Sequence, residues 1–100
     1  MVTVGLLAQF EAKPGKEAEV EKFLKDALSI VNEEIKTISW FALRLSSTTF
    51  GIFDVFANEE GRTIHLSGQV AANLMAKAPE LFVSSPKIQH IDILAAKIKS

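Results

Sequence analysis

Three features of the sequence predict an α+β fold with the element order βαββαβ. An alternating apolar segment and an amphipathic helical segment open the chain, and two strand-like segments separated by a short polar break follow. The second half repeats glycine and aromatic positions of the first at a constant offset: Gly5, Phe10 and Gly15 recur as Gly51, Phe56 and Gly61. Two such βαβ halves build a ferredoxin-like fold with a four-stranded antiparallel sheet. We expect residues 1–100 to form one domain.

The first strand and the first helix are predicted from the spacing of their apolar residues. Residues 2–10 alternate, so one face of the strand is apolar, and Pro14-Gly15 follows as a break. Residues 16–35 carry apolar side chains at helical spacing, namely Val20, Phe23, Leu24, Ala27, Leu28, Val31 and Ile35. This pattern predicts a helix with one buried stripe.

Residues 38–45 and 49–57 are predicted to form a hairpin around Ser46-Ser47-Thr48. The first of these strands is apolar on both faces, with Phe41 and Leu43 on one side and Trp40 and Ala42 on the other. A two-faced apolar strand needs a cover on each side, and one helical layer covers one side only. We therefore expect a second subunit on the other face, and hence a homodimer.

A second helix and a last strand are predicted to complete the chain. Asn58 is the expected N-cap of a helix that runs to about residue 78, with a bend at Ser67-Gly68 and an end at Pro79. The last strand is expected over residues 88–98.

Composition excludes several classes of function. The net charge of −1 argues against a nucleic-acid partner, which would require a basic surplus. Cysteine is absent, and no apolar run approaches the length of a membrane span, so we expect a cytoplasmic protein with no membrane partner. Phosphate-loop spacing is missing, and His65 and His90 lie on different elements without metal-ligand spacing. We expect neither a metal nor a cofactor.

Two charged residues interrupt the apolar hairpin. Arg44 ends the row that contains Trp40, and Asp54 lies between Ile52 and Phe56. Burying an unpaired carboxylate is costly, so we expect Asp54 to pair with Arg44 on the neighbouring strand. Such a pair either fixes the register of the strands or anchors a ligand in a pocket.

The two histidines and the tryptophan are the remaining candidates. On a straight helix, His65 points about 120° away from the apolar line through Gly68 and Met75, which favours a solvated or rim position. A bend at Gly68 would change this direction. Trp40 is more often a core residue than a ligand contact. His90 and Asp92 alternate on the last strand, where an edge pair with a structural role is expected.

The sequence resembles the antibiotic biosynthesis monooxygenase family of dimeric α/β barrels over nearly its whole length. The resemblance includes the strand followed by Lys13-Pro14-Gly15-Lys16, the aromatic hairpin, residues 53–62, residues 64–68 and Leu81-Phe82. Its most specific element is an acidic residue on the third strand that is followed eleven positions later by a histidine, here Asp54 and His65. The family usually has glutamate at the first position, so Asp54 is a conservative departure.

The resemblance implies a homodimer of two facing sheets and a pocket between each sheet and its helices. Characterised members oxygenate quinols and polycyclic phenols without metal, flavin or haem, because the deprotonated substrate itself supplies electrons to O₂. The resemblance makes His65 the candidate proton acceptor and Arg44 a candidate stabiliser of the substrate anion, together with Asp54 as catalytic residues. Trp40, Phe53 and Phe23 are candidate walls for a small aromatic or quinone-like molecule.

Two other functions are weighed against this hypothesis. A non-catalytic dimeric small-molecule-binding or stress-response module would use the same pocket without reacting, and the absence of tyrosine favours it. Haem-degrading relatives share the fold but use a histidine late in the second helix. This chain has no histidine between Leu66 and Ile88, and Met75 lies near the expected place, so haem degradation is disfavoured.

Overall fold

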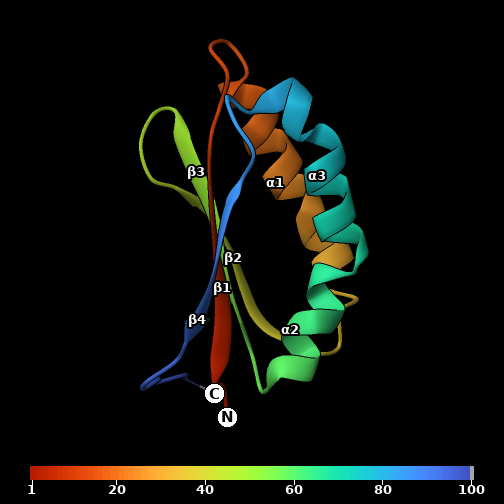
Figure 1. Cartoon of the computed structure of the whole chain (residues 1–100), viewed down its shortest axis with the longest axis vertical. Helices are drawn as coiled ribbons and strands as arrows, with labels where there is room; N and C mark the ends of the chain where they lie inside the picture. The colour runs from red at the N-terminus through yellow and green to blue at the C-terminus, as the bar shows by residue number, and fades with distance from the viewer. Residues whose placement is uncertain (100) are drawn as a thin grey trace.

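A computed structural model describes residues 1–99 as a four-stranded antiparallel sheet with helices on one face (Figure 1). The strand order is β2-β3-β1-β4. The elements are β1 (Val4–Glu11), α1 (Glu17–Val31), β2 (Thr37–Arg44), β3 (Thr49–Phe56), α2 (Glu59–Leu66), α3 (Gln69–Leu81) and β4 (Lys87–Asp92). The predicted βαββαβ order and α+β ferredoxin-like fold are confirmed, and the sheet of the single chain is not closed.

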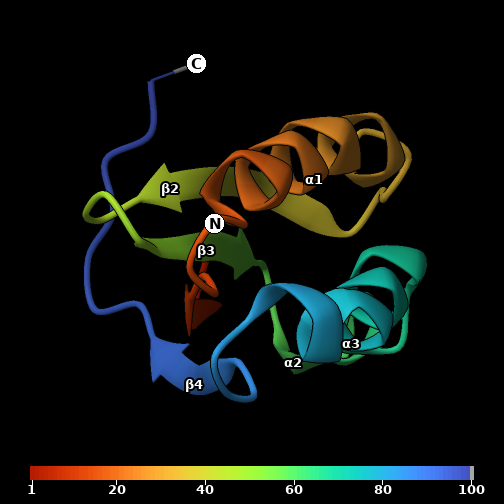
Figure 2. The same ribbon diagram turned by 90° about the horizontal axis from the view of Figure 1, so that it is seen from above.

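The core lies between the sheet and the helices. Figure 2 shows α1 next to the β2 side of the sheet and α2 and α3 next to the β4 side. Alternate residues of β1 and β3 point into this layer, where they meet the apolar stripes of α1 and α3. The main buried cluster consists of Ala8, Phe10, Ala12, Val20, Leu24, Phe50, Ile52, Leu74, Ala78, Leu81 and Phe82.

The opposite face of the sheet is also apolar, as the hairpin pattern predicts, and no helix of residues 1–99 covers it (Figure 1). We call it the open face. Phe41 and Leu45 are half exposed there, and Phe41 stacks on Phe53 with a centroid distance of 6.3 Å. The strands β3 and β1 approach each other closely at Gly51, where an added Cβ would lie 2.8 Å from the Ala8 carbonyl oxygen.

The first helix and the last strand are shorter than the sequence predicts. The first helix ends at Val31 instead of residue 35, and Ile35 is 94% exposed in the following turn. The last strand ends at Asp92 instead of residue 98. Asp92 pairs with Val4, the first residue of β1, and beyond this pair the Ile93 N–H donates to the Thr3 carbonyl at 2.9 Å.

The second helix differs from the prediction in two ways. It is divided into α2 and α3 at Ser67-Gly68, where Gly68 has an extended backbone and the Ser67 hydroxyl donates to the Thr63 and Ile64 carbonyls. It also continues past Pro79 to Leu81. Pro79 lacks the N–H that would bond the Met75 carbonyl, but Met75 is half exposed and water can satisfy that group. No helix within residues 1–99 is long and apolar enough to cross a membrane.

Candidate functional site

The short helix α2 places His65 against the sheet. Asn58 caps the start of this helix, because its side-chain oxygen accepts a hydrogen bond from the Gly61 N–H at 3.1 Å, as the sequence predicts. The helix ends one residue after His65, so its direction is independent of α3. His65 is only 7% exposed. The favoured expectation of a solvated or rim histidine is therefore wrong, because it assumed one straight helix.

His65 lies between two carboxylates supplied by other parts of the chain. Its Nε2 is 3.0 Å from Asp54 Oδ2 on β3, and its Nδ1 is 2.6 Å from Glu34 Oε1 in the turn between α1 and β2. Thr37 at the start of β2 donates its hydroxyl to the same Glu34 oxygen at 2.7 Å. We call Glu34, His65 and Asp54 the buried trio. It joins three elements by charge-assisted contacts.

The two carboxylates favour a doubly protonated ring. A neutral imidazole donates from one nitrogen only, whereas the imidazolium donates from both, toward Asp54 and toward Glu34. Burial alone lowers the pKa of His65, but hydrogen bonds and charge interactions with both carboxylates outweigh this effect and raise the pKa above 6.5. The protonated His65 ring is therefore a weaker acid than that of a free histidine.

Three polar atoms around the buried trio are buried without a hydrogen-bond partner: Asp54 Oδ1, Trp40 Nε1 and Glu34 Oε2. Trp40 and Asp54 are directly paired across β2 and β3, so both side chains point to the helix side of the sheet. An acceptor and a donor therefore remain unused at neighbouring positions. Buried polar groups usually find partners, so such a pair is a candidate ligand contact.

Two cavities flank His65. An inner cavity of about 40 Å³ is lined by Asp54, His65 and apolar side chains that include Leu74 and Ile88. An outer cavity of about 480 Å³ is lined by Glu34, His65, Ile30, Ile64 and other residues of the α1–β2 turn and α2. The inner cavity has room for a few atoms, whereas the outer one is large enough for a small organic molecule.

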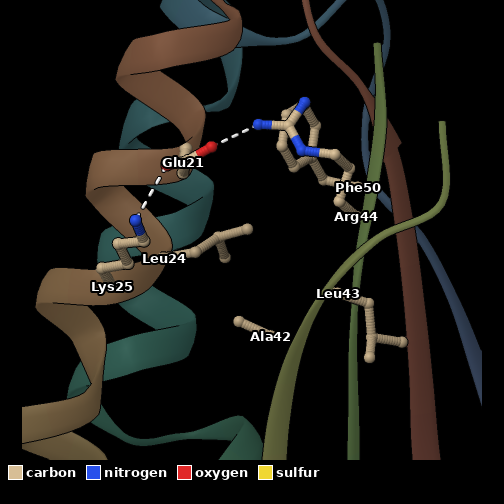
Figure 3. Close-up of a pocket in the computed structure, with 7 residues that line it drawn as sticks. All are labelled: Glu21, Leu24, Lys25, Ala42, Leu43, Arg44 and Phe50. Carbon is tan, nitrogen blue, oxygen red and sulfur yellow. Dashed lines mark hydrogen bonds and ion pairs between the residues drawn. The ribbon is translucent and has the colours of Figure 1, made fainter. Parts of the chain in front are cut away.

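Arg44 does not join this site. It pairs with Phe50 across the hairpin, whereas Asp54 pairs with Trp40, four residues away along β2. The expected Arg44–Asp54 ion pair is therefore wrong. Arg44 instead binds Glu21 on α1, with its guanidinium 4.7 Å from the centre of the Phe50 ring (Figure 3).

The other predicted residues are also distributed over the fold. Phe53 follows Ile52 and precedes Asp54 on β3, so it lies on the open face, away from His65. Phe23 is partly buried on α1 and packs against the main core cluster, as does Trp40. Of the six candidate residues, Asp54 and His65 are in contact, and Trp40 is paired with Asp54 across β2 and β3.

Glu34 is not among the residues predicted from the sequence. Glu33 and Glu34 are adjacent acidic residues after an amphipathic helix, and nothing in the sequence distinguishes them. Only the turn that follows Val31 directs one of them toward His65. Arg62 is not among the predicted residues either: its guanidinium is buried and donates to the Gly5 and Ile91 carbonyls of β1 and β4.

The acidic and histidine side chains do not form a metal centre. His65 separates Asp54 from Glu34, because each carboxylate contacts a different ring nitrogen. Within residues 1–99, no group of three or more histidine and acidic side chains could hold a metal ion. Among the ion pairs formed within residues 1–99, none joins His90 to Asp92.

Comparison with known proteins gives several solved structures of the same fold. A protein of unknown function from Nitrosomonas europaea is 48% identical, with a TM-score of 0.97, and the match covers 100% of this chain and 97% of that one. A "putative antibiotic biosynthesis monooxygenase" from Deinococcus radiodurans is 16% identical with a TM-score of 0.81, over 97% and 98% of the two chains. Another protein of that name from Nitrosomonas europaea is 10% identical with a TM-score of 0.81, over 92% and 90%.

No family model and no curated protein matches the chain. The two structures at 16% and 10% identity establish a shared fold, which is the one implied by the sequence resemblance. The relative at 48% identity is close enough to establish kinship over the whole length. This protein therefore belongs to the same family as the Nitrosomonas europaea protein of unknown function, and it has the fold of proteins named antibiotic biosynthesis monooxygenases.

Proposed function

We propose that the protein is a cofactor-independent monooxygenase that oxidises a small aromatic or quinol substrate with O₂ beside Asp54, His65 and Trp40. The observation that carries this proposal is the unused pair formed by Asp54 Oδ1 and Trp40 Nε1. A phenolic hydroxyl needs an acceptor for its proton and a donor for its oxygen, and these two atoms offer both. The fold shared with proteins named monooxygenases supports the same proposal.

Asp54 is the proton acceptor in this proposal. Both ring nitrogens of His65 are already engaged by carboxylates, so the imidazolium supplies positive charge next to the reacting group. Removal of a proton from the substrate leaves an anion that donates electrons to O₂. The resulting hydroperoxide loses water and leaves a carbonyl group. For a phenol, the O–H group and one ring C–H group thus become the two C=O groups of a quinone. O₂ supplies one carbonyl oxygen and the oxygen of H₂O, with all electrons taken from the substrate.

The dimensions of the inner cavity limit how the substrate binds. Its volume of about 40 Å³ accepts a hydroxyl group or O₂ but not an aromatic ring. In this proposal the ring enters between α3 and β4, where Leu74 and the partly exposed Ile88 border the same cavity. Separation of these two side chains is the movement that substrate binding requires.

The decisive experiment measures oxygen consumption with a panel of hydroquinones and naphthols, in the presence of a metal chelator and without added cofactor. We expect uptake above the uncatalysed rate, and we expect Asp54→Asn to reduce it by about 100-fold or more, because the general base is lost. Asp26→Asn is the matched control, since Asp26 is an exposed carboxylate on α1 that pairs with Lys22. Absence of uptake with every panel member would contradict the proposal.

A second candidate function is favoured by the occupied ring nitrogens of His65. If the buried trio only holds α2 and the α1–β2 turn against the sheet, the protein is a non-catalytic small-molecule-binding module. Panel members would then bind without oxygen consumption. Binding is measured by quenching of the fluorescence of Trp40, the single tryptophan of the chain.

We also propose that the open face is covered by a second copy of this chain. Phe41, Leu43, Leu45 and Phe53 give this face an apolar surface that a single helix layer leaves uncovered. Contact between two such faces buries the apolar side chains of both copies and leaves the helix side of each sheet accessible. The second copy would therefore not cover the side of the sheet on which the candidate site lies.

A further inference from the structure

A second cavity, separate from the buried trio, lies between α1 and the end of β2 near the hairpin. Its volume is about 290 Å³, and Figure 3 shows its lining. Leu24 and Ala42 point into the space between helix and strand, whereas Leu43 points to the other side of the sheet. Glu21 and Arg44 meet across the upper part of the same space, and Lys25 binds Glu21 from the helix side. We call it the α1–β2 cleft.

The base of the α1–β2 cleft is apolar and partly open. Ala42 lies on the helix side of β2, two residues from Trp40, yet it is exposed to solvent. The helix α1 therefore does not close over β2 at this point. Leu24 and Phe50 form the deeper wall and belong to the main core cluster. An apolar group placed on Ala42 would thus extend the core outward.

The polar side of the α1–β2 cleft has a surplus of positive charge. Lys25 Nζ lies 2.8 Å from a Glu21 carboxylate oxygen, and Arg44 binds the other oxygen of that carboxylate. One negative and two positive side chains leave a net charge of +1 at the mouth of an apolar space. Residues 1–99 contain no second carboxylate in the lining of this cleft.

Both cations retain donors that could serve a ligand. The Arg44 guanidinium has five N–H groups. Its Nη2 donates to the Glu21 carboxylate, and its Nη1 donates to the Ser47 carbonyl at 3.3 Å. The Lys25 ammonium has three and uses one for Glu21. Arg44 is also held in place, because its guanidinium lies over the Phe50 ring. A fixed guanidinium is well suited to binding a carboxylate.

We propose that the α1–β2 cleft binds a small amphipathic monoanion, an aromatic carboxylate, with its ring on Leu24 and Ala42 and its carboxylate between Arg44 and Lys25. This site goes beyond the proposed oxygenase function. Along β2, Ala42 lies two residues from Trp40, about 7 Å away, and Arg44 lies four residues from it, about 13 Å away. The two sites are on the same side of the sheet, so a homodimer formed through the open face leaves both accessible.

The probe for this proposal is naphthalene-2-carboxylate, and 2-naphthylmethanol is its uncharged control. Binding is followed by NMR shifts of the Leu24 and Ala42 methyl groups, with the Leu74 methyl groups as an internal reference near the other site. We expect the carboxylate to bind at least about tenfold more tightly than the alcohol. Because Lys25 and Arg44 are 74% and 45% exposed, this preference should weaken several-fold at high salt.

Charge variants give the sharpest test. Arg44→Gln is expected to weaken carboxylate binding by about tenfold and Lys25→Gln by about threefold. Glu21→Gln is expected to strengthen it by about threefold, because it raises the local charge. Lys22→Gln is the matched control, since Lys22 lies on the same helix but pairs with Asp26. Arg44→Lys keeps the charge without the planar fork and should fall between wild type and Arg44→Gln.

Three results would overturn the proposal: equal affinity for the alcohol and the carboxylate, unchanged affinity in both Arg44→Gln and Glu21→Gln, or shifts confined to the Leu74 methyl groups. The wild-type comparison at two salt concentrations decides the question even where a variant does not fold. None of these readouts depends on oxygen consumption, so a failure of the oxygenase proposal is recognised separately.

Discussion

At the scale of single residues, the main feature is a buried histidine held by carboxylates on both sides. The side chains of Asp54 and His65 are 2% and 7% exposed, so their charges interact with little screening by solvent. Loss of one member leaves an unpaired buried charge, which typically costs about 3 kcal/mol or more. Each member of the buried trio is therefore needed for the stability of the fold.

The raised pKa of His65 predicts how stability depends on pH. Because this pKa is higher in the folded than in the unfolded state, the contribution of His65 is fully present below pH 6.5 and is lost as the pH rises through the raised value. We expect His65→Gln to lower the free energy of unfolding by about 3 kcal/mol below pH 6.5, with a smaller loss at alkaline pH. Urea unfolding of both proteins across this range measures the difference.

Glu34→Gln serves as the companion variant for this pH series. It removes one of the two carboxylates that raise the pKa of His65, so the decline in stability should begin at lower pH than in wild type. The NMR titration of the His65 ring follows the same change directly. Identical pH profiles for wild type and His65→Gln would contradict the assignment of a protonated ring.

At the scale of elements, the division between α2 and α3 determines where the candidate site forms. A continuous helix would carry His65 away from the apolar stripe, whereas α2 ends after Leu66 and turns the ring toward β3. The position of α2 depends on its N-terminal cap at Asn58, which satisfies one of the free N–H groups of the first turn.

Removal of this cap should destabilise the protein. We expect Asn58→Ala to lower the free energy of unfolding by about 1 kcal/mol, measured by chemical denaturation. Ser67→Ala at the other end of the same helix is the control, because its exposed hydroxyl only donates to carbonyls of the preceding turn. That variant should stay within about 0.5 kcal/mol of wild type. Equal effects of the two substitutions would show that the cap has no special role.

The sequence predicts the elements better than their junctions. Apolar periodicity is sufficient to place the first three strands and the start of α1, since it reports burial against one core, and the cap residue Asn58 marks the start of α2. Periodicity could not predict the direction of the His65 side chain, because that direction depends on the break at Gly68. It also could not predict the neighbour of Asp54, because the register of the hairpin places Asp54 opposite Trp40. The role of Glu34 depends on a turn between elements, where no periodicity exists.

At the scale of the whole molecule, the sheet has one face covered by helices and one that is not (Figure 1). The single chain is 40 Å long but only 24 × 22 Å across, consistent with one sheet and one helix layer. The apolar side chains of the open face are more numerous than solubility of a monomer favours. This uncovered apolar face is the basis of the proposed homodimer.

A charge on the open face should separate the two copies. We expect sedimentation of wild type to give twice the chain mass of 10.9 kDa, and Phe41→Glu to weaken association about thirtyfold, because a charge would be buried in the contact. Met75→Glu is the matched control: Met75 is 50% exposed on α3, and Phe41 is 52% exposed. A wild-type mass of one chain at micromolar concentration would refute the homodimer.

The strand order also governs the sequence of events during synthesis. The strand β1 leaves the ribosome first, yet it lies inside the sheet between β3 and β4. It therefore stays unpaired until Thr49–Phe56 has emerged, and its second edge stays unpaired until Lys87–Asp92 has emerged as well. Such late pairing over long sequence separation slows folding and exposes an apolar strand to other nascent chains. The sheet can be completed only after β4, the last of its four strands, has been synthesised.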